Sequence, residues 1–325
     1  MKYCDICGTY NFKENNYCIY CGNKLIIENI CQYCGKINGD SDSFCIECGQ
    51  QIKPVAINDF DILFNQYNEN LLLNYDLDDE KYHRILSDIF KRAEYSKISG
   101  ISVKDKILNF ANIFSECKTK SRGYERGFNL GNSIFYDDRL DDSIQIATII
   151  HELSHYLLFE IVERVMCNIF DVKSTSTLQS FVWFFLILPD ISIMNEYCAH
   201  TVEGRFIPYG YQNYASFNAS VENSEIDDEN LNDMIVLGNS FANELIVFLE
   251  KYIDNELRES IKLQYKKDLN EPKFDSIMFE TDVALPLNIK NKFLVKKIYE
   301  TFKFASNIEA RKELEFIRES LDGFD

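Results

Sequence analysis

The amino-acid sequence predicts a mainly helical protein with a small β component, preceded by a small metal-stabilised module. Apolar residues recur at helical spacing through most of residues 54–325. Four Cys-x-x-Cys pairs lie within residues 1–53, and repeats of this size do not bury enough surface to fold without metal. Ser133–Tyr136 has the composition of a short β-strand. We therefore expect two domains, 1–53 and 54–325, which meet at Lys53-Pro54.

The cysteine pairs form two copies of one pattern. The first copy is Cys4, Cys7, Cys18 and Cys21, and the second, shifted by 27 residues, is Cys31, Cys34, Cys45 and Cys48. A glycine follows every pair, and glycine readily adopts the positive φ that a tight turn requires. Two thiolates three positions apart bind one metal ion, and two such turns complete a closed tetrahedral Cys4 site. A closed site of this kind is structural rather than catalytic.

This segment resembles the double zinc ribbon family over about residues 3–52. It lacks the proline often found between the paired cysteines, where Asp5-Ile6 and Gln32-Tyr33 stand instead. We expect two structural Zn²⁺ ions, each held by one sequential set of four cysteines, although a crossed pairing between the repeats satisfies the same spacing. The resemblance implies a recognition surface, and its near-neutral charge favours a protein partner.

The charge of the whole chain bears on its partners. The 325 residues carry a formal net charge of −18, and residues 1–53, with five Lys against six Asp and Glu, contribute little of it. A surface this acidic repels phosphate backbones, so nucleic acid is disfavoured as a partner.

The sequence also bears on localisation. Met1–Cys4 leads directly into the first cysteine pair, without the apolar stretch of a signal peptide. The longest apolar run, 181–188, is shorter than the about 20 residues that span a bilayer. We expect a soluble, cytoplasmic protein without a membrane span.

Apolar periodicity predicts the helices in chain order. The expected helices are 59–74, 78–98 with Asp78 or Asp79 as cap, 103–117, 143–166, a helix after Pro189 that ends near Gly204, 230–266 with a break, 289–305 and 307–321. Residues 177–188 are apolar on all sides, which indicates a buried helix or strand, the wall of a substrate cleft, or a membrane-facing patch.

The helix predicted at 143–166 carries the chemistry. His151 and His155 are four positions apart, so both side chains project from one helical face and can bind one ion. Glu152 lies about 100° further round the helix, within reach of a water on that ion. In this H-E-x-x-H pattern the glutamate is a general base. A catalytic zinc needs a third protein ligand, and Glu196 on the later helix offers one, with His200 four positions beyond it.

These residues resemble the gluzincin peptidases, which combine an HExxH helix with a glutamate on a second helix. The resemblance covers about residues 130–205 and implies a helical zincin-like metallopeptidase domain with one catalytic Zn²⁺ on His151, His155 and Glu196. Where that family often has an aspartate that orients a histidine ligand, this chain has His200. Its role stays open between an orienting partner, a transition-state donor and an alternative ligand. A short edge strand at Ser133–Tyr136 is a candidate for pairing with an extended peptide.

The sequence also offers candidates for an oxyanion donor and for structural side chains. An oxyanion donor is needed, and His200, Arg205, Tyr209 and Tyr211 are candidates. Among the remaining side chains, His83 is expected to be structural, and Cys117, Cys167 and Cys198 are expected to be buried free thiols.

Two functions compete on the sequence. The first is a zinc-dependent endopeptidase or aminopeptidase, with Glu152 and His200 as catalytic residues and a peptide or protein as substrate. The second is a non-catalytic interaction protein, in which the ribbons carry the function and the HExxH ion holds two helices together. A nucleic-acid-binding ribbon protein is disfavoured by the net charge of −18.

Overall fold

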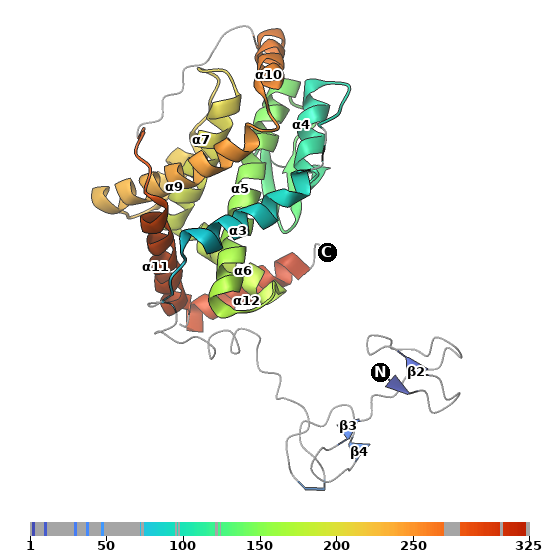
Figure 1. The fold of residues 1–325 in the computed structure, drawn as a ribbon, viewed down its shortest axis with the longest axis vertical. Helices are drawn as coiled ribbons and strands as arrows, with labels where there is room; N and C mark the ends of the chain where they lie inside the picture. Colours follow the sequence, from blue (N-terminus) through green and yellow to red (C-terminus); the bar gives the residue numbers. More distant parts are fainter. Residues whose placement is uncertain are drawn as a thin grey trace. The chain divides into compact units, whose positions relative to one another are not determined.

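The computed structural model describes residues 75–94, 96, 98–120, 123, 125–269, 280–305 and 308–322, with short pieces at 2–3, 10–11, 29–30, 37–38, 47–48 and 72. The chain divides into two compact units, Met1–Ile62 and Leu63–Asp325. The second unit is mainly helical and contains a small three-stranded sheet, which confirms the mainly helical class with a small β component (Figure 1). The predicted boundary after Lys53 lies outside the described residues.

Two short hairpins repeat in the first unit. Strand β1 (Lys2–Tyr3) pairs antiparallel with β2 (Tyr10–Asn11), and β3 (Asn29–Ile30) pairs antiparallel with β4 (Ile37–Asn38). Lys2 opposes Asn11 as Asn29 opposes Asn38, so the hairpins follow the same 27-residue shift as the cysteines. Cys48 is exposed, and the other seven predicted ribbon ligands lie outside the described residues. The two ribbon zinc sites therefore stay predictions.

The sheet of the helical unit contains Ser133–Tyr136 as its central strand. The order is β5–β7–β6, in which β7 (Ser133–Tyr136) runs parallel to β5 (Glu116–Thr119) and antiparallel to β6 (Gly127–Leu130). The prediction of an edge strand at Ser133–Tyr136 is wrong, because a strand paired on both sides has no free backbone edge. Strand β6 is an edge strand instead, and it packs beside helix α5 (Asp142–Phe170).

The helix predicted at 59–74 lies, except for Leu72, outside the described residues, and the next two predicted helices end earlier than expected. Helix α3 (Asp79–Phe90) is capped by Asp78, whose carboxylate accepts a hydrogen bond from the Lys81 backbone. Helix α4 (Val103–Ala111) is shorter than the predicted 103–117. Residues 116–119 form β5 because they pair with β7, and such tertiary pairing overrides local helical preference.

Helix α5 is central and is buried on almost every side (Figure 1). It packs against α6 (Ser176–Ile187) and α7 (Pro189–Phe206). The segment predicted at 177–188 is thus helical up to Ile187, and most side chains of α6 belong to the core. Helix α7 also packs against α9 (Asp228–Leu249), and the two helices approach closely at Gly238, where an added Cβ would stand 2.6 Å from a carbonyl oxygen of α7. Helix α7 is therefore held between α5 on one side and α9 on the other.

The remaining helices complete the unit. They are α8 (Ala215–Asn223), which the sequence pattern did not predict, α10 (Asn255–Asp268), α11 (Leu287–Ala305), α12 (Ile308–Asp322) and the short 3-10 turn Lys91–Ala93. Within the described part of the chain, no single helix has the length and apolarity needed to cross a membrane. Helices α6 and α7 meet these criteria only as a pair, which bends by 86°.

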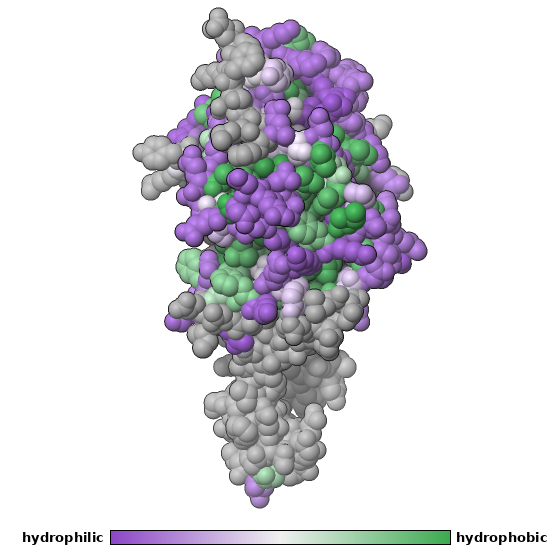
Figure 2. Space-filling model, turned by 90° about the vertical axis from the view of Figure 1, so that its left-hand side faces the viewer, coloured by the Kyte–Doolittle hydropathy of each residue, from purple (hydrophilic) through white to green (hydrophobic). Residues whose placement is uncertain are grey.

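Apolar side chains also reach the surface of the helical unit. On the face that Figure 2 presents, a patch of apolar residues is bordered by hydrophilic ones. Val283 and Ile289 are about half exposed, and Ile289 borders a hollow of about 370 Å³ between α9 and α11. These two side chains do not line the larger cleft beside α5.

Candidate metal centre

Side chains from α5 and α7 converge on one point between the two helices. The Nε2 atoms of His151 and His155 are 3.0 Å apart; the first lies 3.6 Å from Oε2 of Glu196 and the second lies 3.6 Å from Oε1. The structure therefore brings together all three residues predicted as ligands of the catalytic ion. Atoms bonded to one tetrahedral zinc at 2.0–2.1 Å lie about 3.3 Å apart, so the spacing found here fits such an ion.

The outer nitrogens of both histidines are hydrogen-bonded. Nδ1 of His151 lies 3.1 Å from a carboxylate oxygen of Glu203, and Nδ1 of His155 lies 2.7 Å from the amide oxygen of Asn195. Both oxygens are acceptors, so each Nδ1 carries the proton that it donates. In a neutral imidazole the lone pair is then on Nε2, which faces Glu196. Two imidazole lone pairs that face a carboxylate are an arrangement that a cation satisfies.

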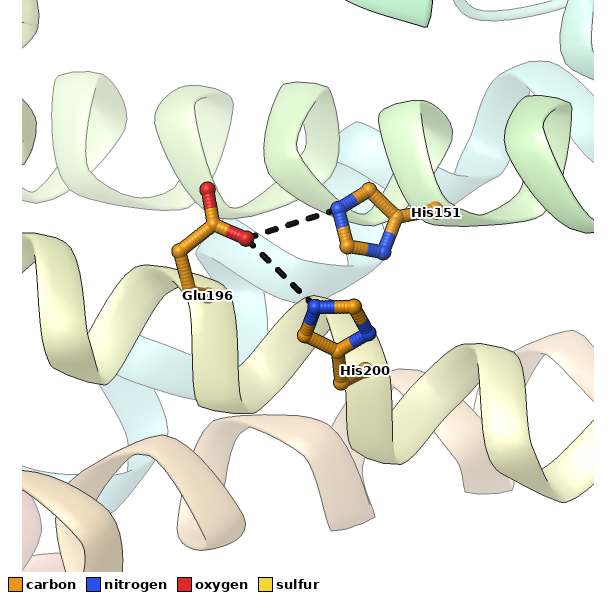
Figure 3. A group of neighbouring side chains, drawn as sticks. All are labelled: His151, Glu196 and His200. Atoms are coloured by element: carbon orange, nitrogen blue, oxygen red, sulfur yellow. Dashed lines mark ion pairs between the residues drawn. The ribbon is translucent and has the colours of Figure 1, made fainter. Parts of the chain in front are cut away.

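His200 also lies at this centre. Its Nε2 is 3.7 Å from Glu196, and Figure 3 shows His151 pointing from α5 toward Glu196 and His200 on α7. One ligand atom from each of His151, Glu196 and His200 lies within 4.8 Å of the other two, so this group could hold a metal ion. Two ligand sets thus share His151 and Glu196 and differ in whether His155 or His200 joins them. The 3.0 Å separation of the His151 and His155 nitrogens favours His155.

The electrostatics of the centre follow from burial and crowding. Burial alone lowers the pKa of His151, but the carboxylates of Glu196 and Glu203 outweigh it and raise that pKa well above the ordinary value. Burial lowers the pKa of His155 to about 4, assisted by the positive charge of His151. Burial raises the pKa of Glu203, but hydrogen bonds from His151 and His200 outweigh it and bring the value to about 2. The 3.0 Å between the two Nε2 atoms is a hydrogen-bond distance, and a cation bound there would replace a proton shared by the two rings.

Glu152 lies beside this centre and is almost fully buried, with 7% of its surface exposed. Burial raises its pKa, His151 opposes this, and the charges of Glu196, Glu203 and Glu125 add to it, which together bring the pKa to about 7. A carboxylate with a pKa close to neutral is suited to accept and return a proton.

A cleft of about 640 Å³ gives access to these groups. Its walls come from the edge strand β6 and the residues before it, from α5, from the end of α6 and from α7 and α8. Trp183, Leu186 and Ile187 of α6 line one side, so the predicted cleft wall in this segment is present together with core packing. Strand β6 passes close to α5 at Gly127, where an added Cβ would stand 2.4 Å from Thr148 and 3.3 Å from Cγ of Glu152. Glycine at this position allows the edge strand to border the centre.

The raised pKa of Glu152 predicts a pH-dependent effect of Glu152→Gln on stability. The unfolded chain loses this proton near the ordinary value of 4.5, whereas the folded chain holds it up to about pH 7. The stability that Glu152 contributes is therefore present at low pH and is lost as the pH rises through 7. We expect the metal-free Gln variant to gain about 2 kcal/mol over wild type on going from about pH 5.5 to about pH 8.

Urea unfolding in the presence of a chelator measures this difference. Trp183 is the one tryptophan of the chain and lies in the helical unit, so its fluorescence reports on the unfolding of that unit. An equal stability difference at both pH values would show that Glu152 titrates normally.

No family model, curated protein or solved structure matches this chain.

The structure separates the candidate donors. Of the four, His200 is the one that lines the cleft within the described residues. Arg205 is 2.6 Å from Glu250 in an ion pair on the protein surface, and Tyr209 is 80% exposed. His83 is on the surface and its Nδ1 contacts the Asp79 carbonyl oxygen, consistent with a structural role.

The three isolated cysteines are unsuited to nucleophilic chemistry. Cys198 is buried as predicted, whereas Cys117 and Cys167 are only partly buried, which corrects the expectation for those two. Burial raises the pKa of Cys117 to about 12 and that of Cys167 to about 11, so both stay protonated at neutral pH.

The sequence pattern did not identify three residues of the centre. Glu203 lies seven positions after Glu196, two helical turns on the same face, so a search for a carboxylate at that spacing would have found it. Asn195 directly precedes Glu196 and has no distinctive spacing. Ser216 comes from α8, which the pattern did not predict, and lies beyond the expected limit of the site near 205.

Proposed function

We propose that this chain is a zinc-dependent metallopeptidase whose catalytic ion is held by His151, His155 and Glu196. One observation carries the proposal: two imidazole Nε2 atoms and a carboxylate meet on the wall of a 640 Å³ cleft, next to the buried Glu152. Asn195 and Glu203 support the ligands by accepting their Nδ1 protons. A peptide or protein is the proposed substrate.

Each residue of the centre has a separate role in the proposed hydrolysis of a peptide bond. When bound, zinc supplies a Lewis acid that polarises the scissile carbonyl and lowers the pKa of a water to about 7. Glu152 takes the proton of that water and delivers it to the leaving amine. Of the candidate oxyanion donors, His200 lines the cleft wall, and its two ring nitrogens contact Ser216 and Glu203.

We extend the proposal to the ribbons, which would bind two structural Zn²⁺ ions. The ribbons would then dock a substrate or a partner protein. The matched 27-residue shift of the hairpins and of the cysteines supports two equivalent metal-stabilised repeats.

Metal removal tests the enzymatic proposal. The purified chain is expected to cleave a mixture of unfolded protein substrates, to lose that activity in 1,10-phenanthroline and to regain it when zinc is added back. Cleavage that persists in the chelator would contradict a metal-dependent reaction, and a chelator of calcium and magnesium alone serves as the control. Cleavage fragments also distinguish internal cleavage from release of single N-terminal residues.

The second candidate function is a non-catalytic interaction protein with a structural ion at the same point. The proximity of His200 to Glu196 and His151 favours it, because a fourth protein ligand would close the site. Such a site has no exchangeable solvent ligand. This second candidate function predicts that the chain binds metal without hydrolysing peptides.

A further inference from the structure

The three histidines of the centre differ in how their ring nitrogens are used. His151 and His155 each have Nδ1 on an outer acceptor and Nε2 toward the other ring. His200 has contacts at both nitrogens: Nε2 lies 2.8 Å from the Ser216 hydroxyl, and Nδ1 lies 3.4 Å from Glu203. The Ser216 contact occupies the nitrogen of His200 that lies nearer to Glu196.

The single hydroxyl proton of Ser216 determines which group donates in the contact between Ser216 and His200. The Ser216 hydroxyl donates to a Glu196 oxygen at 2.7 Å, and a serine has only one proton to donate. Nε2 of His200 must therefore be the donor in its contact with Ser216. A ring nitrogen that carries a proton has no lone pair to offer a metal ion. With that proton in place, His200 is not a ligand through Nε2, while its Nδ1 faces Glu203.

Helix α8 holds Ser216 in this position. Phe217, the next residue, is completely buried, and its ring lies 5.6 Å from that of Tyr197 on α7. Tyr214, just before the helix, packs its ring 5.3 Å from that of His200. Ser216 itself is exposed at the cleft. The helix start is therefore anchored on both sides of Ser216, while the hydroxyl reaches between Glu196 and His200.

We propose that Ser216 is a positioning residue that keeps His200 out of the coordination sphere of the metal and so keeps one coordination position open. The inference rests on the proposed function, because it concerns the same ion. It also explains how a site with four candidate protein ligands uses only three. When Ser216 is absent, Nε2 of His200 is released beside Glu196, at 3.7 Å, and is free to close the site.

The test is the binding of acetohydroxamate, a small bidentate zinc ligand, to the zinc-loaded full chain by calorimetry. If His200 occupies the open position in nine molecules of ten, the affinity of Ser216→Ala falls about tenfold relative to wild type. Ser220→Ala, on the same helix but outside the cleft lining, is the matched control and is expected to bind as wild type does.

A double variant separates positioning from a general structural effect. In Ser216→Ala/His200→Gln the closing ligand is gone, so hydroxamate affinity is expected to return toward that of wild type. Equal affinity of wild type and Ser216→Ala, or no recovery in the double variant, overturns the inference. A wild-type chain that takes up no zinc at His151 and His155 overturns the proposed function itself, which metal analysis of the same samples shows.

Discussion

Glu152→Gln is expected to lower the rate of peptide hydrolysis by about 10²- to 10⁴-fold, the usual contribution of a general acid–base residue. The amide has nearly the same shape as the carboxylate but cannot take a proton from water. Glu152 is 7% exposed and its Cγ lies beside Gly127, so an isosteric replacement leaves this packing unchanged. The zinc content is expected to stay as in wild type, because Glu152 is not one of the three proposed ligands. Initial rates on a fluorogenic peptide mixture, with metal analysis of the same protein, measure both effects.

Glu163→Gln is the matched control for this experiment. Glu163 lies on the same helix, is 6% exposed, and accepts hydrogen bonds from Ser174 and Gln179 outside the cleft. Its replacement is expected to leave hydrolysis within about twofold of wild type, because most substitutions away from the reacting groups act through stability alone. If Glu152→Gln were as active as Glu163→Gln, the proposed proton transfer would be wrong.

The double substitution His151→Ala/His155→Ala is expected to lower the zinc content of the full chain from three ions to two. Both histidine ligands of the helical site are lost, whereas the eight ribbon cysteines are unchanged. One carboxylate, Glu196, with His200 beside it, leaves too few ligands for a stable site, since structural and catalytic zinc sites use at least three protein ligands. Elemental analysis after purification without chelator measures the stoichiometry, and hydrolysis is expected to disappear together with the third ion.

His83→Ala controls for the general effect of removing a histidine, because His83 lies on the surface of α3 and contacts only local backbone in the described structure. Three ions in this variant and two in the double variant would assign the third ion to α5. Two ions in both proteins would mean that the helical site is empty as purified, and zinc addition must then restore the third. A third ion that survives in the double variant would refute the ligand assignment.

Much of the candidate site was open to prediction because it is local. His151, Glu152 and His155 lie within two turns of one helix, and helix geometry alone places the two histidines on one face. The N-cap at Asp78 was predicted for the same reason, since capping depends on a few neighbouring residues. Glu196 was found by its spacing on the second helix and by the resemblance to a two-helix zinc motif.

Features that depend on pairing between distant segments were not predicted correctly. Residues 116–119 continue a helical pattern in the sequence yet form β5, because β7 is available to pair with them. Ser133–Tyr136 was recognised as a strand, but its central position depends on having partners on both sides. Local sequence contains no information about which neighbours a strand will find.

By itself, therefore, the sequence of this protein determined the helical class, the 27-residue cysteine repeat and the ligand face of α5. Only the tertiary structure decided that Asn195 and Glu203 orient the two histidines, that β6 rather than β7 borders the cleft, and that Ser216 contacts His200. The physical reason is the range of the interactions involved. Spacing along one helix is set by its backbone geometry, whereas contacts among α5, α7 and α8 depend on how three separate elements pack, as the close approach of α9 to α7 at Gly238 illustrates.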